Sequence, residues 1–140
     1  MTPERPETIA VFGASGSQPG DGHYEAGVLC GRLLAEAGYA VATGGYGGTM
    51  EAVSLGASQA GGHVIGITAP SVFPSREGVN KHVHEERSTP NIVNRIGELV
   101  DSSVGAVVLW GSIGTAAEMI LAWNDAYVAP LSDRLSLIHI

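Results

Sequence analysis

The sequence predicts an α/β fold built on a doubly wound, all-parallel sheet, and two observations lead to it. Four short apolar runs rich in β-branched residues are typical of buried strands; they span 8–13, 39–43, 63–68 and 104–110. Segments with apolar residues three or four positions apart alternate with these runs and predict helices at 24–37, 50–60, 90–100 and 115–127. This alternation indicates parallel strands joined by right-handed crossovers, with helices on both faces.

The expected strand order is 3-2-1-4, so the first and fourth strands lie side by side where the order reverses. Ligands of open α/β sheets bind at this reversal, beyond the carboxyl ends of the strands. Glycine-rich loops follow three of the four strands, at 13–22, 44–51 and 111–118, and each leads into a helix N-terminus. Unpaired N–H groups and the positive end of the helix dipole favour an anionic ligand there. The sequence therefore predicts one crevice for a charged small molecule.

The candidate binding residues lie in these loops. They are Gly13, Ser15, Gly44, Gly45, Gly47, Gly48, Thr49, Met50, Gly111, Ser112, Gly114 and Thr115. Glu118, three residues after Thr115, either completes a helix capping box or contacts a bound sugar from the first turn of the helix. Thr89 and Pro90 predict the N-cap and first residue of the preceding helix. Helical spacing places Arg95 on the polar stripe of that helix, where simple exposure to solvent is the alternative to a functional role.

Other nucleotide and metal motifs are incomplete. The first loop has Gly13 and Gly16 but no third glycine, and the second strand ends in Thr43 without an acidic residue, which argues against a dinucleotide cofactor. No Gly-Lys-Ser/Thr follows a glycine cluster, so a P-loop is excluded. We interpret the run from His82 to Glu86 as a solvated loop segment. Neither a metal nor a cofactor is expected.

Composition limits the partners. A chain of 140 residues with 44% hydrophobic content is expected to form one domain. A net charge of -7 gives no basic stripe for nucleic acid, and a single cysteine, Cys30, excludes an internal disulfide framework. No signal peptide or membrane-spanning run is evident, so a cytoplasmic protein without membrane contact is expected.

The last six residues, "LSLIHI", differ in style from the rest and are interpreted as a translated sequencing adapter; the alternative is a real apolar strand. The single domain is therefore assigned to 1–134 and the tail to 135–140, with the natural chain expected to continue. Because no fifth strand is then available, 104–110 is expected to be an unpaired apolar edge of the sheet. The segment 71–88 is the one long irregular stretch, and long loops of this kind tend to be functional.

Over 8–128 the chain resembles the LOG-like group of Rossmann-type nucleotide-binding proteins, often called lysine decarboxylase-like. The resemblance rests on "GGYGGTMEA", on "ASQAGGHVIGI", and on Arg95 sixteen positions before Gly111 in "WGSIGTAAE". The family pattern has Arg-Lys where this chain has Arg95-Ile96, and Pro-Gly-Gly where it has Trp110-Gly111-Ser112. The ending Met50-Glu51, in place of Met-Gly, is closer to the branch of molybdenum cofactor carrier proteins.

The resemblance implies two alternative functions. In the first, the protein is a nucleotide 5′-monophosphate phosphoribohydrolase, in which Glu118 stabilises the cationic sugar or orients water and Arg95 balances phosphate or orients Glu118. In the second, it is a carrier that binds a nucleotide or phosphorylated cofactor without cleaving it. Retention of Arg95, Thr115 and Glu118 favours the enzyme, whereas Ile96 and Ser112 favour the carrier. The resemblance also implies a homodimer with helices at the contact.

Overall fold

The computed structural model describes residues 5–76, 78–128 and 136–139. The elements follow in the order β1 (Thr8–Phe12), α1 (Gly22–Glu36), β2 (Ala40–Thr43), α2 (Thr49–Gln59), β3 (Val64–Thr68), β4 (Glu85–Ser88), α3 (Ile92–Asp101), β5 (Gly105–Val108), α4 (Ile113–Val128) and β6 (Ser136–His139). None of the described helices is long and apolar enough to span a membrane.

The sheet is parallel throughout its described part and has six strands in the order β4-β3-β2-β1-β5-β6. The four expected strands correspond to β1, β2, β3 and β5. Their spatial order, β3-β2-β1-β5, confirms the predicted order 3-2-1-4. The order reverses between β1 and β5, where Ile9 pairs with Gly105 and Phe12 with Val108.

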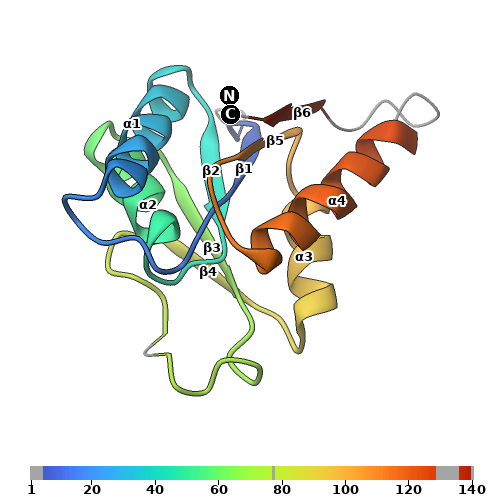
Figure 1. Ribbon diagram of the computed structural model, residues 1–140. Helices are drawn as coiled ribbons and strands as arrows, with labels where there is room; N and C mark the ends of the chain where they lie inside the picture. Colours follow the sequence, from blue (N-terminus) through green and yellow to red (C-terminus); the bar gives the residue numbers. More distant parts are fainter. Residues whose placement is uncertain (1–4, 77, 129–135, 140) are drawn as a thin grey trace.

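The helices form two layers around the sheet, as the doubly wound class requires. Figure 1 shows α1 and α2 on one face and α3 and α4 on the other. Side chains alternate along β1, so that Phe12 joins the core cluster with Leu99 of α3 and Ala122 of α4. Val11 points the other way and packs in the cluster that contains Val53 and the rest of the α2 face. Both faces of the central strands are therefore buried, as the continuous apolar runs predict.

Close contact between α1 and α2 depends on glycine. A Cβ atom on Gly56 would overlap the carbonyl oxygen of Val28, and one on Gly31 would overlap that of Val53. Gly97, inside α3, has open space where its Cβ would lie. Replacing glycine by alanine should therefore have opposite effects on stability at Gly56 in α2 and at Gly97 in α3.

We expect Gly56→Ala to destabilise the fold by about 1–3 kcal/mol or more, because the helices must separate to accept the methyl group. Gly97→Ala should instead stabilise it by about 0.5–1 kcal/mol, since alanine loses less backbone entropy in a helix. Urea unfolding followed by circular dichroism measures both. Equal changes in the two variants would contradict the packing role of Gly56.

Two strands differ from the sequence prediction. β4 lies within the segment expected to be irregular and pairs with β3 from Ile65↔Glu85 to Thr68↔Ser88. The prediction that 104–110 is an unpaired edge is wrong, because β6 pairs with β5 from Gly105↔Ser136 to Val108↔His139. Hydrophobic periodicity is weak in a four-residue strand, and β4 is an edge strand that alternates between partly buried and exposed residues. The origin of 135–140 in an adapter stays a prediction.

The start of α3 also differs from the prediction. Thr89 is not the N-cap: its N–H and hydroxyl both donate to the carbonyl oxygen of Thr68, at 2.8 and 2.7 Å, which extends the β3–β4 pairing. Asn91 caps the helix instead, and its side-chain oxygen accepts the N–H of Asn94 at 2.8 Å. Thr89 therefore belongs to the edge of the sheet, and α3 begins two residues later than expected.

Candidate functional site

Two adjoining cavities lie at the carboxyl ends of β1 and β5, where the strand order reverses. The first, which we call the charged cavity, has a volume of about 260 Å³ and is lined by Gly13, Ser15, Met50, Phe73, Arg76, Ile92, Arg95, Ser112, Gly114, Thr115 and Glu118. The second, the aromatic cavity, has a volume of about 570 Å³ and is lined by Ala14, Ser15, Gly16, Ser17, Asp21, Gly22, His23, Trp110, Gly111 and Ser112. Ser15 and Ser112 line both.

Arg95 is buried, not solvated. Its side chain is only 9% exposed, and its Nε and Nη2 donate to the carbonyl oxygens of Ile67 and Gly44 at 2.8 and 2.9 Å. These carbonyls lie at the carboxyl ends of β3 and β2, so the arginine ties α3 to the sheet beside the cavity. Burial lowers the pKa of Arg95 below its usual value, and the Glu118 carboxylate acts in the opposite direction.

A second cation, Arg76, enters the charged cavity from the long β3–β4 connection. Its guanidinium lies 4.0 Å from the ring centroid of Phe73 and 4.7 Å from that of Tyr46, within the range of cation–π contacts. Arg95 lies on the same rings, at 5.3 Å from Tyr46 and 5.5 Å from Phe73. Figure 1 shows this connection extending beyond the sheet at the end where α4 begins.

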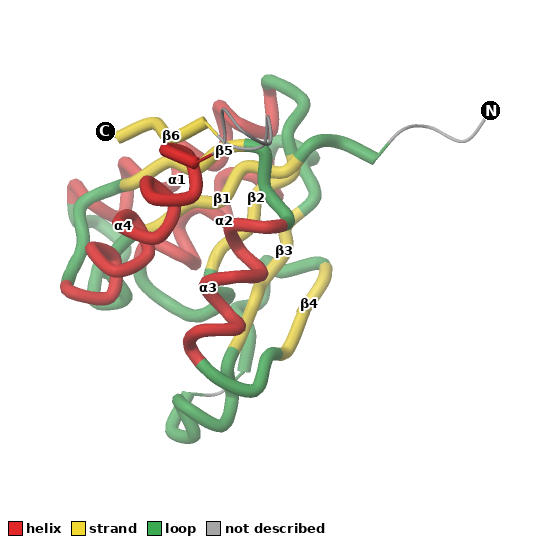
Figure 2. The backbone as a smooth tube through the Cα atoms, turned by 90° about the vertical axis from the view of Figure 1, so that its right-hand side faces the viewer, coloured by secondary structure: helices red, strands yellow, loops and turns green. Residues whose placement is uncertain are grey.

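The connection that carries Arg76 is held in place by hydrogen bonds. Asn80 donates its side-chain amide to the carbonyl oxygens of Gly45 and Tyr46, at 3.2 and 2.9 Å. Its backbone N–H also donates to Gly45, at 2.8 Å. The Tyr46 hydroxyl accepts the N–H of Ala69 at 3.2 Å. These bonds fix the Tyr46 ring and tie the β3–β4 connection, whose backbone is drawn in Figure 2, to the loop after β2.

Glu118 supplies the carboxylate of the charged cavity. It is half-buried in α4, and desolvation raises the pKa of its carboxyl group to about 7, while the positive charge of Arg95 limits the rise. Within the described residues, no hydrogen bond or ion pair engages this carboxylate. A perturbed acidic group beside an arginine in a cavity is typical of a functional site.

The capping-box interpretation of Thr115 and Glu118 is wrong. α4 begins at Ile113, so Thr115 lies in the first helical turn, where its hydroxyl oxygen accepts the N–H of Ser112 at 3.3 Å. Thr115 thereby satisfies a backbone N–H at the N-terminus of α4. Glu118 lies in the second turn and makes no hydrogen bond to this terminus. This leaves the Glu118 carboxylate available to a ligand.

The structure brings together only part of the predicted binding set. Gly13, Ser15, Met50, Gly111, Ser112, Gly114 and Thr115 line one cavity or the other, together with Arg95 and Glu118. Gly44, Gly45, Gly47, Gly48 and Thr49 line neither. Thr49 is buried, with its hydroxyl 3.0 Å from that of Ser17. Gly48 has a backbone φ of 68°, which residues other than glycine rarely adopt.

The lining residues that were not predicted from the sequence as ligand contacts include Phe73, Arg76, Asp21, His23 and Trp110. Only the length of the β3–β4 connection hinted at a role for Phe73 and Arg76. His23 and Trp110 come from different loops and meet only in the fold, with stacked rings whose centroids are 4.3 Å apart.

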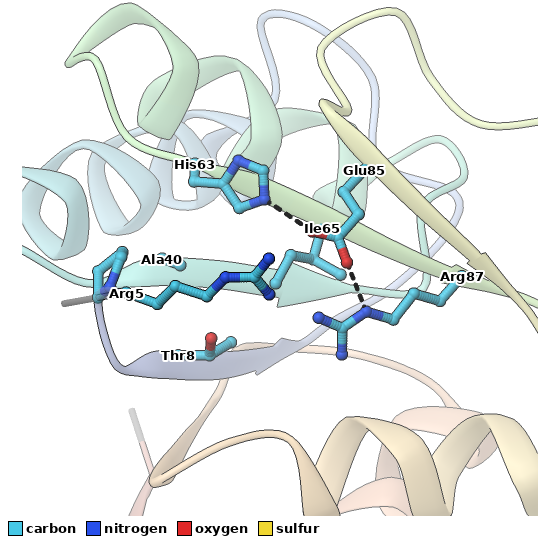
Figure 3. A pocket seen from close by; sticks show the side chains of 8 residues that line it. Arg5, Thr8, Ala40, His63, Ile65, Glu85 and Arg87 are labelled. Carbon is cyan, nitrogen blue, oxygen red and sulfur yellow. Dashed lines mark hydrogen bonds and ion pairs between the residues drawn. The ribbon is translucent and has the colours of Figure 1, made fainter. Parts of the chain in front are cut away.

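A third cavity, of about 300 Å³, lies at the opposite, amino-terminal edge of the sheet. Figure 3 shows Arg5, His63, Glu85 and Arg87 around it. Its polar groups are largely paired with one another. Glu85 bridges His63 and Arg87, at 3.0 and 2.6 Å, and these partners lower the pKa of its carboxyl group.

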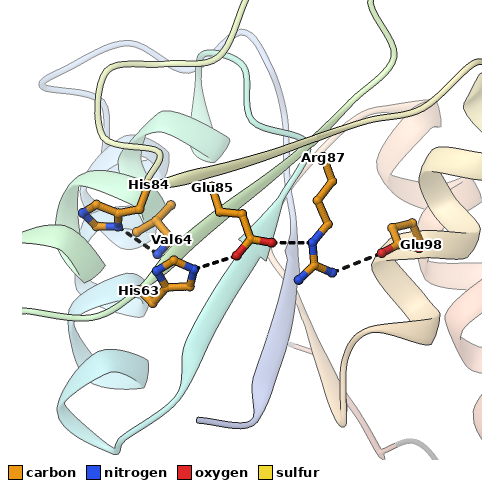
Figure 4. A network of polar contacts seen from close by, with 6 residues as sticks. All are labelled: His63, Val64, His84, Glu85, Arg87 and Glu98. Carbon is orange, nitrogen blue, oxygen red and sulfur yellow. Dashed lines mark hydrogen bonds and ion pairs between the residues drawn. The ribbon is translucent and has the colours of Figure 1, made fainter. Parts of the chain in front are cut away.

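The run from His82 to Glu86 is only in part the solvated loop that was expected, because Glu85 and Glu86 belong to β4 and His84 contacts β3. Nδ1 of His84 accepts the N–H of Val64 at 3.0 Å, and Arg87 also pairs with Glu98 at 3.1 Å (Figure 4). Glu86 accepts the hydroxyl of Thr68 at 2.8 Å. Across residues 5–76, 78–128 and 136–139, no group of three or more potential ligand side chains is arranged to hold a metal ion. These side chains tie β4 to β3 and α3.

Comparison with known proteins places this geometry in a family. The model of the SLOG cluster4 family matches residues 6–133. A protein of Oryza sativa subsp. japonica, named a probable cytokinin riboside 5′-monophosphate phosphoribohydrolase LOGL5, is 32% identical over 127 residues, which is 87% of this chain and 50% of that protein. A Mycobacterium tuberculosis protein, named a cytokinin riboside 5′-monophosphate phosphoribohydrolase, is 32% identical over 104 residues, which is 69% of this chain and 55% of that protein.

The chain thus spans about half the length of these curated relatives. Among solved structures, the molybdenum cofactor binding protein from Rippkaea orientalis superposes with a TM-score of 0.78 at 28% identity. That match covers 97% of this chain and 78% of the other. Fold, matched range and relatives agree: the chain belongs to the SLOG cluster4 family of LOG-like, Rossmann-type proteins.

Proposed function

We propose that the protein hydrolyses the N-glycosidic bond of nucleoside 5′-monophosphates and releases the base and ribose 5-phosphate. One observation carries the proposal: the Glu118 carboxylate, which has no hydrogen-bond partner among the described residues and whose pKa is raised to about 7, shares a cavity with the guanidinium groups of Arg76 and Arg95. A carboxylate stabilises the positive charge that develops on the sugar, and a guanidinium binds the phosphate. The curated relatives named for this reaction support the proposal.

In the proposed reaction the bond between C1′ and the base nitrogen breaks, and the electron pair leaves with the base. The sugar passes through an oxocarbenium-like state, which the ionised Glu118 stabilises while it orients the attacking water. The water oxygen bonds to C1′, and its proton is transferred to the departing base. Arg76 binds the phosphate, because two donors of Arg95 are already engaged by backbone carbonyls.

Ile96, where the family pattern has lysine, faces the core and not the charged cavity. Ile96 is partly buried and packs against the core cluster between the sheet and the α3–α4 layer, and it does not line the charged cavity. The loss of the family lysine at this position therefore weighs less against catalysis than the sequence suggests.

A carrier function is the second candidate. Its support is the superposition with the molybdenum cofactor binding protein from Rippkaea orientalis over nearly the whole chain, together with Ser112 at the junction of the two cavities. A carrier would bind a phosphorylated ligand in the same cavities and leave it intact.

A panel of nucleoside 5′-monophosphates separates the two candidates. Each is incubated with the protein, free base and ribose 5-phosphate are quantified by chromatography, and affinity is measured by calorimetry. Release of both products in equal amounts supports the hydrolase. Binding without release, for every member of the panel, contradicts the hydrolase and supports the carrier.

We also propose that the chain forms a homodimer through α4. Ile113, Ile120 and Tyr127 recur every seven residues, with Trp123 beside them, and these side chains are 60–88% exposed. Such spacing makes a continuous apolar stripe, and a second copy of the same stripe is its natural partner.

The dimer is tested by charge insertion. Ile120→Glu should shift the protein from dimer to monomer in sedimentation velocity, because a carboxylate in an apolar contact loses its hydration. Leu29→Glu, at an exposed apolar position of α1 on the other layer, is the matched control and should leave the dimer intact. A monomeric wild-type chain would contradict the proposal.

A further inference from the structure

The aromatic cavity contains a flat surface that the proposed chemistry does not use. His23, in the first turn of α1, and Trp110, just after β5, stack with ring centroids 4.3 Å apart and planes 8° from parallel. The indole remains 62% exposed although the imidazole covers part of it. The backbone below it is fixed, because Ala14 donates its N–H to the carbonyl oxygen of Trp110 at 3.2 Å.

The charges of the two cavities differ in a way that orients a nucleotide. Two arginines line the charged cavity, whereas none of the described residues that line the aromatic cavity is an arginine or a lysine, and Asp21 contributes a carboxylate there. Asp21 accepts the N–H of Gln18 at 2.9 Å and has no cationic partner among the described residues. A phosphate is attracted more strongly to the charged cavity, which has two arginines, than to the aromatic cavity, where the Asp21 carboxylate offsets the positive N-terminal end of α1. The larger cavity is left for the uncharged part of the ligand.

We propose that the aromatic cavity binds the heterocyclic base by stacking on Trp110, while the sugar and phosphate occupy the charged cavity. This inference rests on the proposed nucleotide ligand. Ser15 and Ser112, which line both cavities, then flank the glycosidic bond, and Glu118 approaches it from the sugar side. His23 holds the indole in place. Because every base has a flat aromatic face, stacking on Trp110 should accept different bases and exclude ligands that lack a base.

Fluorescence tests the proposal directly, because the chain has only two tryptophans. Trp123→Phe keeps an aromatic ring at the exposed position on α4 and leaves Trp110 as the single tryptophan. In this variant, AMP should quench the emission of Trp110, whereas ribose 5-phosphate, which lacks the base, should bind without quenching. Calorimetry on the same samples confirms that both ligands bind. Equal quenching by the two ligands, or none by bound AMP, would overturn the proposal.

Substitution of Trp110 provides an independent measurement. Trp110→Leu should weaken AMP binding about tenfold and leave the affinity for ribose 5-phosphate unchanged, because only the base loses its stacking surface. Trp110→Phe, which keeps a ring, should recover most of the affinity. If both variants weaken both ligands equally, Trp110 has only a structural role and the proposal fails.

The outcomes separate this inference from the proposed hydrolysis. Quenching by AMP without product release would refute the hydrolase and retain the base-binding role of Trp110. Base release with unchanged affinity in Trp110→Leu would retain the hydrolase and refute the base subsite.

Discussion

Replacing Glu118 by glutamine is expected to abolish base release and, at the same time, to make the fold more stable above neutral pH. The amide has the shape of the carboxylate but cannot stabilise a developing sugar cation, so the rate of hydrolysis should fall about 10³-fold while nucleotide binding persists. Product release and calorimetry on the same preparation measure the two quantities. A variant that keeps normal turnover would remove Glu118 from the chemistry.

The gain in stability follows from the raised pKa. In the folded protein the pKa of Glu118 is about 7 against a usual 4.5, so the folded chain binds the proton more tightly than the unfolded chain does. Glu118 therefore leaves stability unchanged below about pH 4.5, and its ionisation lowers stability progressively as the pH rises to about 7. At about 1.4 kcal/mol per pKa unit, the full cost is about 3 kcal/mol.

Glu118→Gln removes this cost because glutamine does not ionise. The variant should match wild type in urea unfolding at pH 4 and exceed it by up to about 3 kcal/mol at pH 8. Glu25→Gln, at an exposed site in the first turn of α1, is the matched control and should stay within about 0.5 kcal/mol of wild type at both values. A pH-independent difference for Glu118→Gln would show that desolvation of the carboxylate is not the cause.

The layer arrangement and the strand order were predictable because apolar periodicity and glycine-rich turns are local signals. The exposed edge strand β4 was missed because it alternates over only four residues and its pairing partner lies some twenty positions earlier. The start of α4 was placed two residues late, since Ile113 is 88% exposed and gives no signal of packing against the core. Patterns within one segment report burial, and they do not report pairing between segments.

In the candidate site, too, local patterns predicted the position of the site but not the contacts between segments. The reversal of strand order predicted where the two cavities lie, and Glu118 could be chosen from its position in the segment 111–118 that follows β5. Helical spacing placed Arg95 on the polar stripe of α3 and the resemblance gave it a role in the site, but neither predicted that its long side chain reaches carbonyls at the ends of β2 and β3. Arg76 belongs to an irregular connection, where no period exists from which its direction could be predicted.

The second large expected effect separates the two arginines. Arg95→Ala should destabilise the fold by about 3 kcal/mol, because the carbonyl oxygens of Ile67 and Gly44 lose their donors in a buried place. Arg76→Ala should change stability by less than about 1 kcal/mol, since Arg76 is half-buried and stacks on rings without donating to the backbone. Urea unfolding of both variants checks this contrast.

Ligand affinity should follow the opposite order. The phosphate needs a guanidinium with free donors; the Arg76 guanidinium makes no hydrogen bond to another described residue, whereas two donors of Arg95 are engaged by the sheet. Arg76→Ala should therefore weaken AMP binding by about 10- to 100-fold and leave adenosine binding nearly unchanged. Arg76→Lys keeps the charge and should recover part of the difference. If Arg76→Ala weakens AMP and adenosine equally, the phosphate lies elsewhere. If Arg95→Ala, measured where it is still folded, is the variant that loses the preference for AMP, then Arg95 binds the phosphate despite its bonds to the sheet, which is one of the two roles that the family resemblance implies.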